Sequence, residues 1–492
     1  MRGLLLALVI AYELIVIVGI GLYVAKKAES KGKGKDDFML AGRDMPLFQV
    51  GATLALTILG TVHILGLFEH SWSMGVPSIW FSIAHVTTLA VICVATGRWV
   101  RRTGVSTIPE LLEVLFKSKG YRTLVACAMA PLIWGILTLE TQGAGIILST
   151  LTGVSIREGA IIGAIFGVLY VYIAGMREIG AVNLANIAVM YAGVIVATAF
   201  LTFGLPAGWD GVAEYYVSTS GPEYTSVFGS WEIFLAFGLS NVFAVTFFQG
   251  ISQKGLSGAL AARDEATVRK ALWIAAPLNG LFGVFTVSMG MAAKSMPEFN
   301  ALGPKLAAPT MLAEMLPWWL AAWLLASFLG AVLSTYAVSV LAPATLFVKD
   351  IYVPLYNPNA SEAEQTRMVR IVVLVLGLLA LLPAATLPPI VGAILWLFSW
   401  LVPVFWFVVF GLFWKRSTAA AVITTIAAWI ATCVWSFTSL PSVLGWQSVH
   451  NVYITCLVTG VLGIILTAVL PGEKGLFRNR GGRFASGLSQ AQ

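Results

Sequence analysis

The sequence contains 492 residues, enough for three or four soluble domains, but 58% of them are hydrophobic and only 11% are charged. A soluble protein with this composition could not cover its surface with polar groups, so the chain must be surrounded by lipid. The net charge of +7 does not indicate a nucleic-acid partner, because the basic residues are spread over short loops between apolar runs. The four cysteines lie within apolar runs and lack metal-ligand spacing, which predicts neither a disulfide nor a metal site.

Apolar runs of about 20 residues predict thirteen membrane-spanning helices. The first run ends at Lys26-Lys27 without a small-residue cleavage site, so we expect a retained helix and not a signal peptide. The predicted spans cover residues 3–25, 47–72, 76–99, 122–152, 156–175, 180–204, 230–252, 268–293, 316–347, 368–387, 389–413, 417–437 and 449–470.

The distribution of lysine and arginine predicts the orientation of the chain. If the N-terminus lies outside, loops on the cytoplasmic side hold 26 of the 30 basic residues, and only Arg2, Arg157, Lys294 and Lys305 lie outside. Such an asymmetry is typical of inner-membrane proteins. We therefore expect a multi-pass protein of the cell inner membrane with a cytoplasmic C-terminus.

Spans 2–6 and 7–11 can be compared as two sets of five, residues 47–204 and 230–413. The first span of each set contains glycine beside polar residues, at 60–63 and at 238–241. Such positions allow a membrane helix to unwind and offer backbone groups to a ligand. The alternative is that these glycines only permit close helix packing. The whole of residues 1–470 is then one transmembrane domain, followed by a basic tail at 471–492.

Five short motifs occur in the order found in one family of membrane transporters. They are residues 38–43, 106–112, 174–177, Gln253-Lys254 with 261–264, and Ser334-Thr335 with 349–352. On these motifs the chain, over about residues 5–470, resembles the sodium/solute symporter family, whose members carry sugars, proline, pantothenate, sialic acid and short carboxylates. The resemblance implies a leucine-transporter-like inverted repeat of five helices and sodium-coupled import of a small polar solute by alternating access.

A candidate cation site lies on span 9. Sodium is a hard cation that binds about five or six oxygens, and Ala331, Ser334 and Thr335 share one helix face. By itself this pattern is more typical of hydroxyls that bond to the carbonyl four residues earlier. The resemblance implies that the triplet holds sodium, with main-chain carbonyls of Leu56 and Leu59 at the break of span 2.

Ionisable groups at membrane depth are costly and indicate functional sites. The resemblance places His63, Ser82, His85 and Asn241 against the solute, and Trp400 on span 11 near the same cavity. Neutral imidazoles that donate to the solute would favour a carboxylate. The alternatives are histidines that only bond to neighbouring carbonyls, or metal or haem ligation by His63 with His70.

Glu140 in span 4 is the most conspicuous buried charge, and Glu13 in span 1 has no predicted role. For Glu140 we expect either pairing with His63 or His85, or a direct contact with the solute. A proton-coupled carrier, with Glu140 or a histidine as the proton site, is the nearest alternative to sodium coupling. A membrane sensor is a more distant alternative, and no motif indicates an enzyme or a cofactor other than the coupling ion.

The resemblance also bears on stoichiometry. Some members of the family hold a second sodium ion with an aspartate on span 6 and serines just after the span-9 pair. The matching positions here are Val182-Asn183, Ala337 and Val338. A second cation would lose its counter-charge and two oxygens in an apolar setting. We therefore expect one sodium ion per solute.

Overall fold

The computed structural model describes residues 2–20, 23–24, 26, 40–173, 176–384, 386 and 388–479. These residues are largely helical, with one short antiparallel ribbon formed by Lys415–Arg416 (β1) and Glu473–Lys474 (β2). The described helices are α1 (Arg2–Glu13), α3 (Leu47–Leu56), α4 (Leu67–Met74), α5 (Trp80–Val91), α6 (Gly97–Thr103), α7 (Ile108–Phe116), α8 (Lys119–Thr152), α9 (Ile156–Ile173), α10 (Met176–Gly204), α11 (Gly208–Thr219), α12 (Trp231–Ile233), α13 (Ser240–Gln249), α14 (Ser257–Ala261), α15 (Glu265–Ser295), α16 (Pro297–Asn300), α17 (Ala307–Met315), α18 (Trp318–Leu346), α19 (Val353–Leu355), α20 (Glu362–Leu379), α21 (Leu381–Ala384), α22 (Ile390–Phe398), α23 (Val402–Phe413), α24 (Thr418–Phe437), α25 (Leu440–Val443), α26 (Asn451–Val469) and α27 (Leu476–Asn479).

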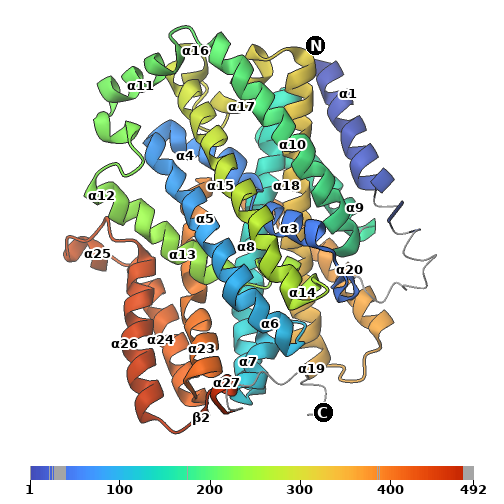
Figure 1. Cartoon of the computed structure of the whole chain (residues 1–492), viewed down its shortest axis with the longest axis vertical. Helices are drawn as coiled ribbons and strands as arrows, with labels where there is room; N and C mark the ends of the chain where they lie inside the picture. The colour runs from blue at the N-terminus through green and yellow to red at the C-terminus, as the bar shows by residue number, and fades with distance from the viewer. Residues whose placement is uncertain are drawn as a thin grey trace.

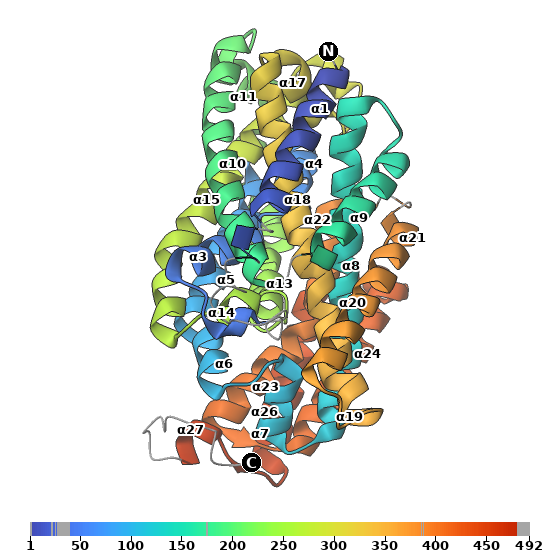
Figure 2. The same cartoon turned by 90° about the vertical axis from the view of Figure 1, so that its right-hand side faces the viewer.

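Within the described residues, ten helices are long and apolar enough to cross a membrane. They match ten of the thirteen predicted spans. The other three predicted spans correspond to α1, whose continuation falls partly outside the described residues, to a helix divided into α3 and α4, and to the 18-residue helix α9. The fold is therefore all-α, as predicted. In Figures 1 and 2, α1 begins at the upper end and α27 lies at the lower end, so the chain crosses the molecule an odd number of times.

The break predicted in span 2 is present. Helix α3 ends at Leu56, residues 57–60 are not helical, and a π-helical turn, Val62–Gly66, leads into α4. Because the backbone there no longer bonds to itself in full, it can offer polar groups to other parts of the protein. The unwinding occurs in the interior of the molecule, where Leu56 and Leu59 are fully buried.

The break predicted at 238–241 in span 7 is wrong. The helix runs through these residues, with a π-helical turn at Phe234–Leu239, and unwinds only at residues 250–256, before α14. A Cβ atom at Gly238 would lie 3.1 Å from Cγ of Trp80, so this glycine allows α5 to pack closely. The close-packing alternative therefore holds here, and a π-helical turn absorbs the irregularity without breaking the helix.

Helix α18 is the centre of the molecule, and its apolar segment is buried along its whole length. It packs against α1, α8, α9, α10 and α20, and Figures 1 and 2 both show it enclosed by other helices. A helix that is apolar on all sides is expected in the interior of a bundle. The few hydroxyl groups on α18 are therefore displayed to other helices and not to lipid.

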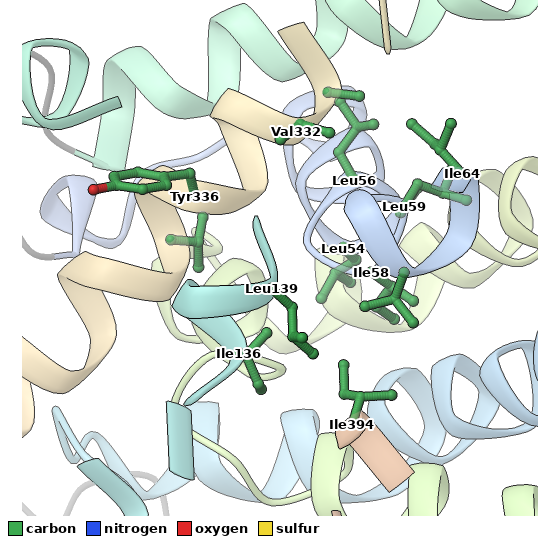
Figure 3. Close-up of a cluster of buried hydrophobic side chains, with 14 of the residues drawn as sticks. Leu54, Leu56, Ile58, Leu59, Ile64, Ile136, Leu139, Val332, Tyr336 and Ile394 are labelled. Atoms are coloured by element: carbon green, nitrogen blue, oxygen red, sulfur yellow. The ribbon is translucent and has the colours of Figure 1, made fainter. Parts of the chain in front are cut away.

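A cluster of large apolar side chains surrounds the break of span 2 (Figure 3). Leu56, Leu59 and Ile64 come from the two sides of the break, Leu139 comes from α8, and Ile394 comes from α22. All five side chains are buried. The cluster excludes water from the break, so any polar group there depends on partners within the protein.

Candidate cation and solute site

Three of the five oxygens predicted to hold sodium lie together between α18 and the end of α3. The Thr335 hydroxyl donates to the carbonyl of Leu56 at 2.8 Å and to that of Ala331 at 3.0 Å. The bond to Ala331 is the ordinary contact of a hydroxyl with the carbonyl four residues earlier. The bond to Leu56 is not, because its partner is 279 residues away in the chain.

Ser334 contributes a fourth oxygen to the same region. Its hydroxyl donates to the side-chain oxygen of Asn183 on α10. Because the proton points to Asn183, the lone pairs of the serine oxygen remain available for another ligand. The amide group of Asn183 also donates to the Thr53 hydroxyl on α3, at 3.3 Å. Asn183 therefore links α18 to α3 on one side of the candidate site.

Leu59, whose carbonyl is the fifth predicted oxygen, lies next to Gly60, the residue at which the break meets α18. A Cβ atom on Gly60 would lie 2.7 Å from Cβ of Thr335 and 2.7 Å from Oε2 of Glu140. Only a residue without a side chain can occupy this position without displacing its neighbours. Gly60 thus brings the backbone of the break against α18 and α8 together.

Glu140 is paired with a residue that the sequence analysis used only as part of a motif. Its Oε2 accepts the backbone N–H of Thr61 at 2.9 Å, and its Oε1 lies 3.8 Å from Nζ of Lys254. The expectation that Glu140 pairs with His63 or His85 is wrong. Lys254 lies in the irregular segment 250–256, where the span-7 helix unwinds. This position brings its long side chain to α8. A buried carboxylate needs a counter-charge, so the lysine of the Gln253-Lys254 motif was the signal that could have identified the partner, and the structure buries it.

His63 and His85 lie side by side, with ring centroids 4.4 Å apart, and both contact the ring of Phe81. Nδ1 of His63 lies 3.1 Å from the carbonyl oxygen of Ile58, and Nδ1 of His85 lies 2.7 Å from that of Phe81. A carbonyl oxygen can only accept, so each Nδ1 carries a proton and Nε2 of a neutral ring is an acceptor. Nε2 of His63 is buried without a hydrogen-bond partner among the described residues.

Asn241 lies on α13, which packs against the helix that carries His85. Helix α5 touches span 7 where Trp80 meets Gly238, in the π-helical turn before α13, and again where Thr88 donates to the carbonyl of Val245 in α13. Asn241 follows Gly238 by three residues, and His85 precedes Thr88 by three, so both lie between these two contacts. The Asn241 amide donates to the carbonyl of Phe237 at 2.6 Å, and its oxygen is buried without a partner in the described part of the chain.

The remaining two predicted solute contacts lie at other helix interfaces. Ser82 faces α15, where a Cβ atom on Gly283 would overlap its hydroxyl. Trp400 packs against Trp396 and Trp429, between the α22–α23 segment and α24. The structure therefore brings His63 and His85 together and places Asn241 on α13, which packs against α5, whereas Ser82 and Trp400 are directed toward α15 and α24.

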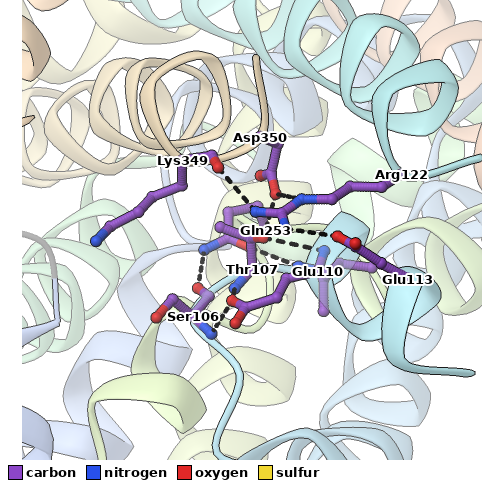
Figure 4. Close-up of polar contacts among 9 residues, drawn as sticks. Ser106, Thr107, Glu110, Glu113, Arg122, Gln253, Lys349 and Asp350 are labelled. Atoms are coloured by element: carbon purple, nitrogen blue, oxygen red, sulfur yellow. Dashed lines mark hydrogen bonds and ion pairs between the residues drawn. The ribbon is translucent and has the colours of Figure 1, made fainter. Parts of the chain in front are cut away.

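The lower end of the molecule in Figure 1 is held by a polar network (Figure 4). Arg122, near the start of α8, binds Asp350 at 2.8 Å and Glu113 at 2.7 Å. Asp350 also accepts the hydroxyl proton of Thr107, the residue that caps α7. Gln253 accepts the backbone N–H of Ile108 at 3.2 Å. The network joins α7, α8, the end of the α18 segment and the 250–256 segment.

A smaller polar contact lies at the upper end. Lys305, before α17, binds Glu69 of α4 at 3.1 Å and donates to the carbonyl of Pro388 at 3.0 Å. Glu69 in turn accepts the backbone N–H of Ile390 at 3.3 Å. This contact joins α4, the loop before α17 and the start of α22. Polar contacts thus connect the helices that surround the site at both ends of the molecule.

A bundle of membrane-spanning helices with a broken helix in its interior, and polar groups gathered at the break, defines a secondary transporter. The comparisons with known proteins identify its family. The sequence model of the family described as "Sodium:solute symporter family" matches residues 38–427, and the chain belongs to that family. It is a sodium-coupled solute symporter and not an enzyme.

Individual relatives are distant in sequence and similar in length. A sodium/glucose cotransporter of Vibrio parahaemolyticus is 24% identical over 464 residues, which cover 86% of this chain and 83% of that protein. A sodium/pantothenate symporter of Escherichia coli is 24% identical over 439 residues, 85% and 87% of the two chains. The structure of a Na⁺-coupled sialic acid symporter in a substrate-bound outward-open state superposes with a TM-score of 0.80, at 16% identity over 96% of this chain and 99% of that one. The last comparison shows that the chain has the leucine-transporter-like fold.

Proposed function

We propose that this symporter imports one small polar solute with one sodium ion, bound at the hydroxyls of Ser334 and Thr335 and the carbonyls of Leu56, Leu59 and Ala331. The observation that carries the proposal is the bond of 2.8 Å between the Thr335 hydroxyl and the Leu56 carbonyl. It brings oxygens of the central helix and of the broken helix within reach of one ion. These oxygens are neutral, and sodium binds such groups without the cost of a buried carboxylate.

The contacts of Asn183 support a stoichiometry of one sodium ion. Its side chain bonds to Ser334 and Thr53 and fills the space between α18 and α3 with a neutral amide. Neighbouring Ala337 and Val338 are buried, and their side chains carry no oxygen. A second cation at this position would therefore find neutral oxygens already bonded to one another and no counter-charge.

For the solute we propose a molecule that presents hydrogen-bond donors, such as hydroxyl or amino groups. The sequence favoured a carboxylate, because neutral imidazoles can donate. In the structure the Nδ1 protons of His63 and His85 and an amide proton of Asn241 point to backbone carbonyls. Nε2 of His63 and Oδ1 of Asn241 are left as buried acceptors without a partner among the described residues. Burying acceptors beside a solute without donors would cost about 1–3 kcal/mol for each unsatisfied group.

The distribution of basic residues supports an N-terminus outside and a C-terminus in the cytoplasm, which makes the lower end of Figure 1 cytoplasmic. The network of Figure 4 then closes the cytoplasmic side, and the contact of Lys305 with Glu69 closes the outer side. Alternating access would require each set of contacts to open in turn. Proton coupling through Glu140 is a second candidate, but the pairing of Glu140 with Lys254 favours sodium.

The proposal is tested in proteoliposomes that contain the full chain. With one sodium ion per solute, uptake should depend on sodium with a Hill coefficient near one, and reversal potentials should fit 1:1 coupling. One charge across 100 mV supplies about 2.3 kcal/mol, and a tenfold sodium gradient adds about 1.4 kcal/mol. A neutral solute could thus be concentrated roughly 500-fold.

A variant locates the ion. Ser334→Ala combined with Thr335→Ala should raise the sodium concentration for half-maximal uptake at least tenfold, because two of about five oxygens are lost. An unchanged sodium dependence in this variant would place the ion elsewhere. A reversal potential that requires two sodium ions would contradict the stoichiometry.

A further inference from the structure

A buried ion pair connects the two halves of the chain next to the proposed sodium site. Glu140 lies on α8, Lys254 lies in the segment between α13 and α14, and their side chains are only 1% and 3% exposed. Burying two charges is costly, and removing one of them leaves the other without a counter-charge. The two residues must therefore act as a unit, and their position next to the proposed sodium site indicates a functional role in addition to any effect on stability.

The carboxylate end of the pair is part of the break in span 2. Glu140 accepts the backbone N–H of Thr61 at 2.9 Å, and the Gly60 position lies between its Oε2 atom and Thr335. One turn along α8, Gly143 lies so close to Thr61 that any side chain there would overlap it. The conformation of the backbone at residues 60–61, which directs the carbonyl of Leu59, is thus set jointly by α18 and by Glu140.

The ammonium end of the pair belongs to the lower closure of the molecule. Gln253, the neighbour of Lys254, donates to the carbonyl of Ser106 at 3.1 Å and accepts from the backbone of Ile108 at 3.2 Å. These two residues flank Thr107, which is bonded to Asp350 in the network of Figure 4. Beside this segment lies a pocket lined in part by Gln253, Ser257, Leu341 and Thr345. A movement of the 250–256 segment would therefore open or close the lower side.

We infer that Glu140 and Lys254 are positioning residues that couple occupation of the sodium site to closure of the lower side. With sodium bound, the break holds the Thr61 N–H toward Glu140, and the carboxylate holds Lys254 and the 250–256 segment in place. When the ion leaves, the break relaxes, the carboxylate moves with it, and Lys254 releases the segment. The inference rests on the proposed position of the sodium ion and adds how its binding reaches the gate.

The coupling is measured with sodium alone, in the full-length protein in membranes. The four native cysteines are replaced, and a Ser257→Cys reporter in the pocket is labelled with a maleimide while potassium is exchanged for sodium at constant ionic strength. In the otherwise unchanged protein, sodium should slow labelling by at least fivefold. Glu140→Gln retains an acceptor for the Thr61 N–H but loses the charge, and Lys254→Met removes only the ammonium.

Each single variant should raise the half-saturating sodium concentration for protection at least tenfold. The double variant Glu140→Gln with Lys254→Met should recover the melting temperature lost in a single variant, because it leaves no unpaired charge. It should not recover protection by sodium and should be no worse than either single variant, because one substitution already breaks the link between the two ends. Lys474→Met, an exposed lysine on β2, is the matched control and should leave protection unchanged. A purely structural pair would lower the melting temperature without shifting the sodium dependence.

Two outcomes separate this inference from the proposed function. If sodium protects the parent, and Ser334→Ala with Thr335→Ala shifts that protection while neither pair variant does, the coupling is refuted and the sodium site stands. If Ser334→Ala with Thr335→Ala has no effect on protection, the proposed sodium site itself fails. Strictly additive effects of Glu140→Gln and Lys254→Met on the half-saturating sodium concentration would also overturn the inference. Where a single variant does not fold, the variant that carries both Glu140→Gln and Lys254→Met keeps the test valid.

Discussion

Gly60 offers the sharpest test of the cation site, because its substitution changes geometry without removing any oxygen. A Cβ atom there would lie 2.7 Å from Cβ and Cγ2 of Thr335 and from Oε2 of Glu140, well inside normal contact distance. The neighbours are one β-branched side chain and one carboxylate bonded to Thr61, and neither can rotate away freely. In Gly60→Ala we expect the break to move away from α18 by several tenths of an ångström or more.

The magnitude follows from this displacement. Overpacking of a buried site costs about 1–3 kcal/mol, and a ligand that needs both sides of the gap loses about that much affinity. Since about 1.4 kcal/mol corresponds to a tenfold change, the half-saturating sodium concentration should rise roughly 5- to 150-fold. This concentration is measured from the rise in melting temperature of the purified protein as sodium is added.

A matched control separates this effect from a general cost of alanine in a helix. Gly460 lies within α26, where a Cβ atom would meet no other atom within 4 Å. Gly460→Ala should therefore leave sodium binding unchanged and should not lower the melting temperature, because alanine favours the helix over glycine. If Gly60→Ala binds sodium as the parent does, the break does not form one wall of the sodium site.

Two further predictions concern the solute and the topology. His63→Ala and Asn241→Ala should each weaken solute binding, measured by calorimetry, by about 1–3 kcal/mol, or roughly 5- to 150-fold. The control His450→Ala, at the N-terminus of α26, should leave solute binding unchanged. Affinity equal to that of the parent in both His63→Ala and Asn241→Ala would show that the solute binds elsewhere. A tag before Arg2 should be reached by an impermeant antibody on intact cells and a tag after the C-terminus should not, and finding both tags on one side would contradict thirteen spans.

The sequence was sufficient for the class of protein and for the placement of Ser334 and Thr335 on one turn of a central helix. Membrane helices are specified by local composition, because each apolar run satisfies its own backbone hydrogen bonds within lipid. A motif such as Ser334-Thr335 lies on one turn of one helix, so its geometry follows from spacing alone. The break at Gly60 was also located, from glycine beside polar residues, although the same signal at 238–241 did not produce a break.

The partners of the buried polar groups were decided by tertiary structure. Gly238 resembles Gly60 in the sequence, but in the fold it faces Trp80 and supports packing, and the second break lies at residues 250–256. That displacement is what carries Lys254 to Glu140 and excludes the predicted pairing with histidine. Which acceptor a buried proton finds depends on atoms from distant parts of the chain, as with His63 and Ile58 at a break that no regular helix would provide. The spacing of residues along one helix determines on which face each side chain lies, but only the packing of several helices determines which partners that side chain contacts.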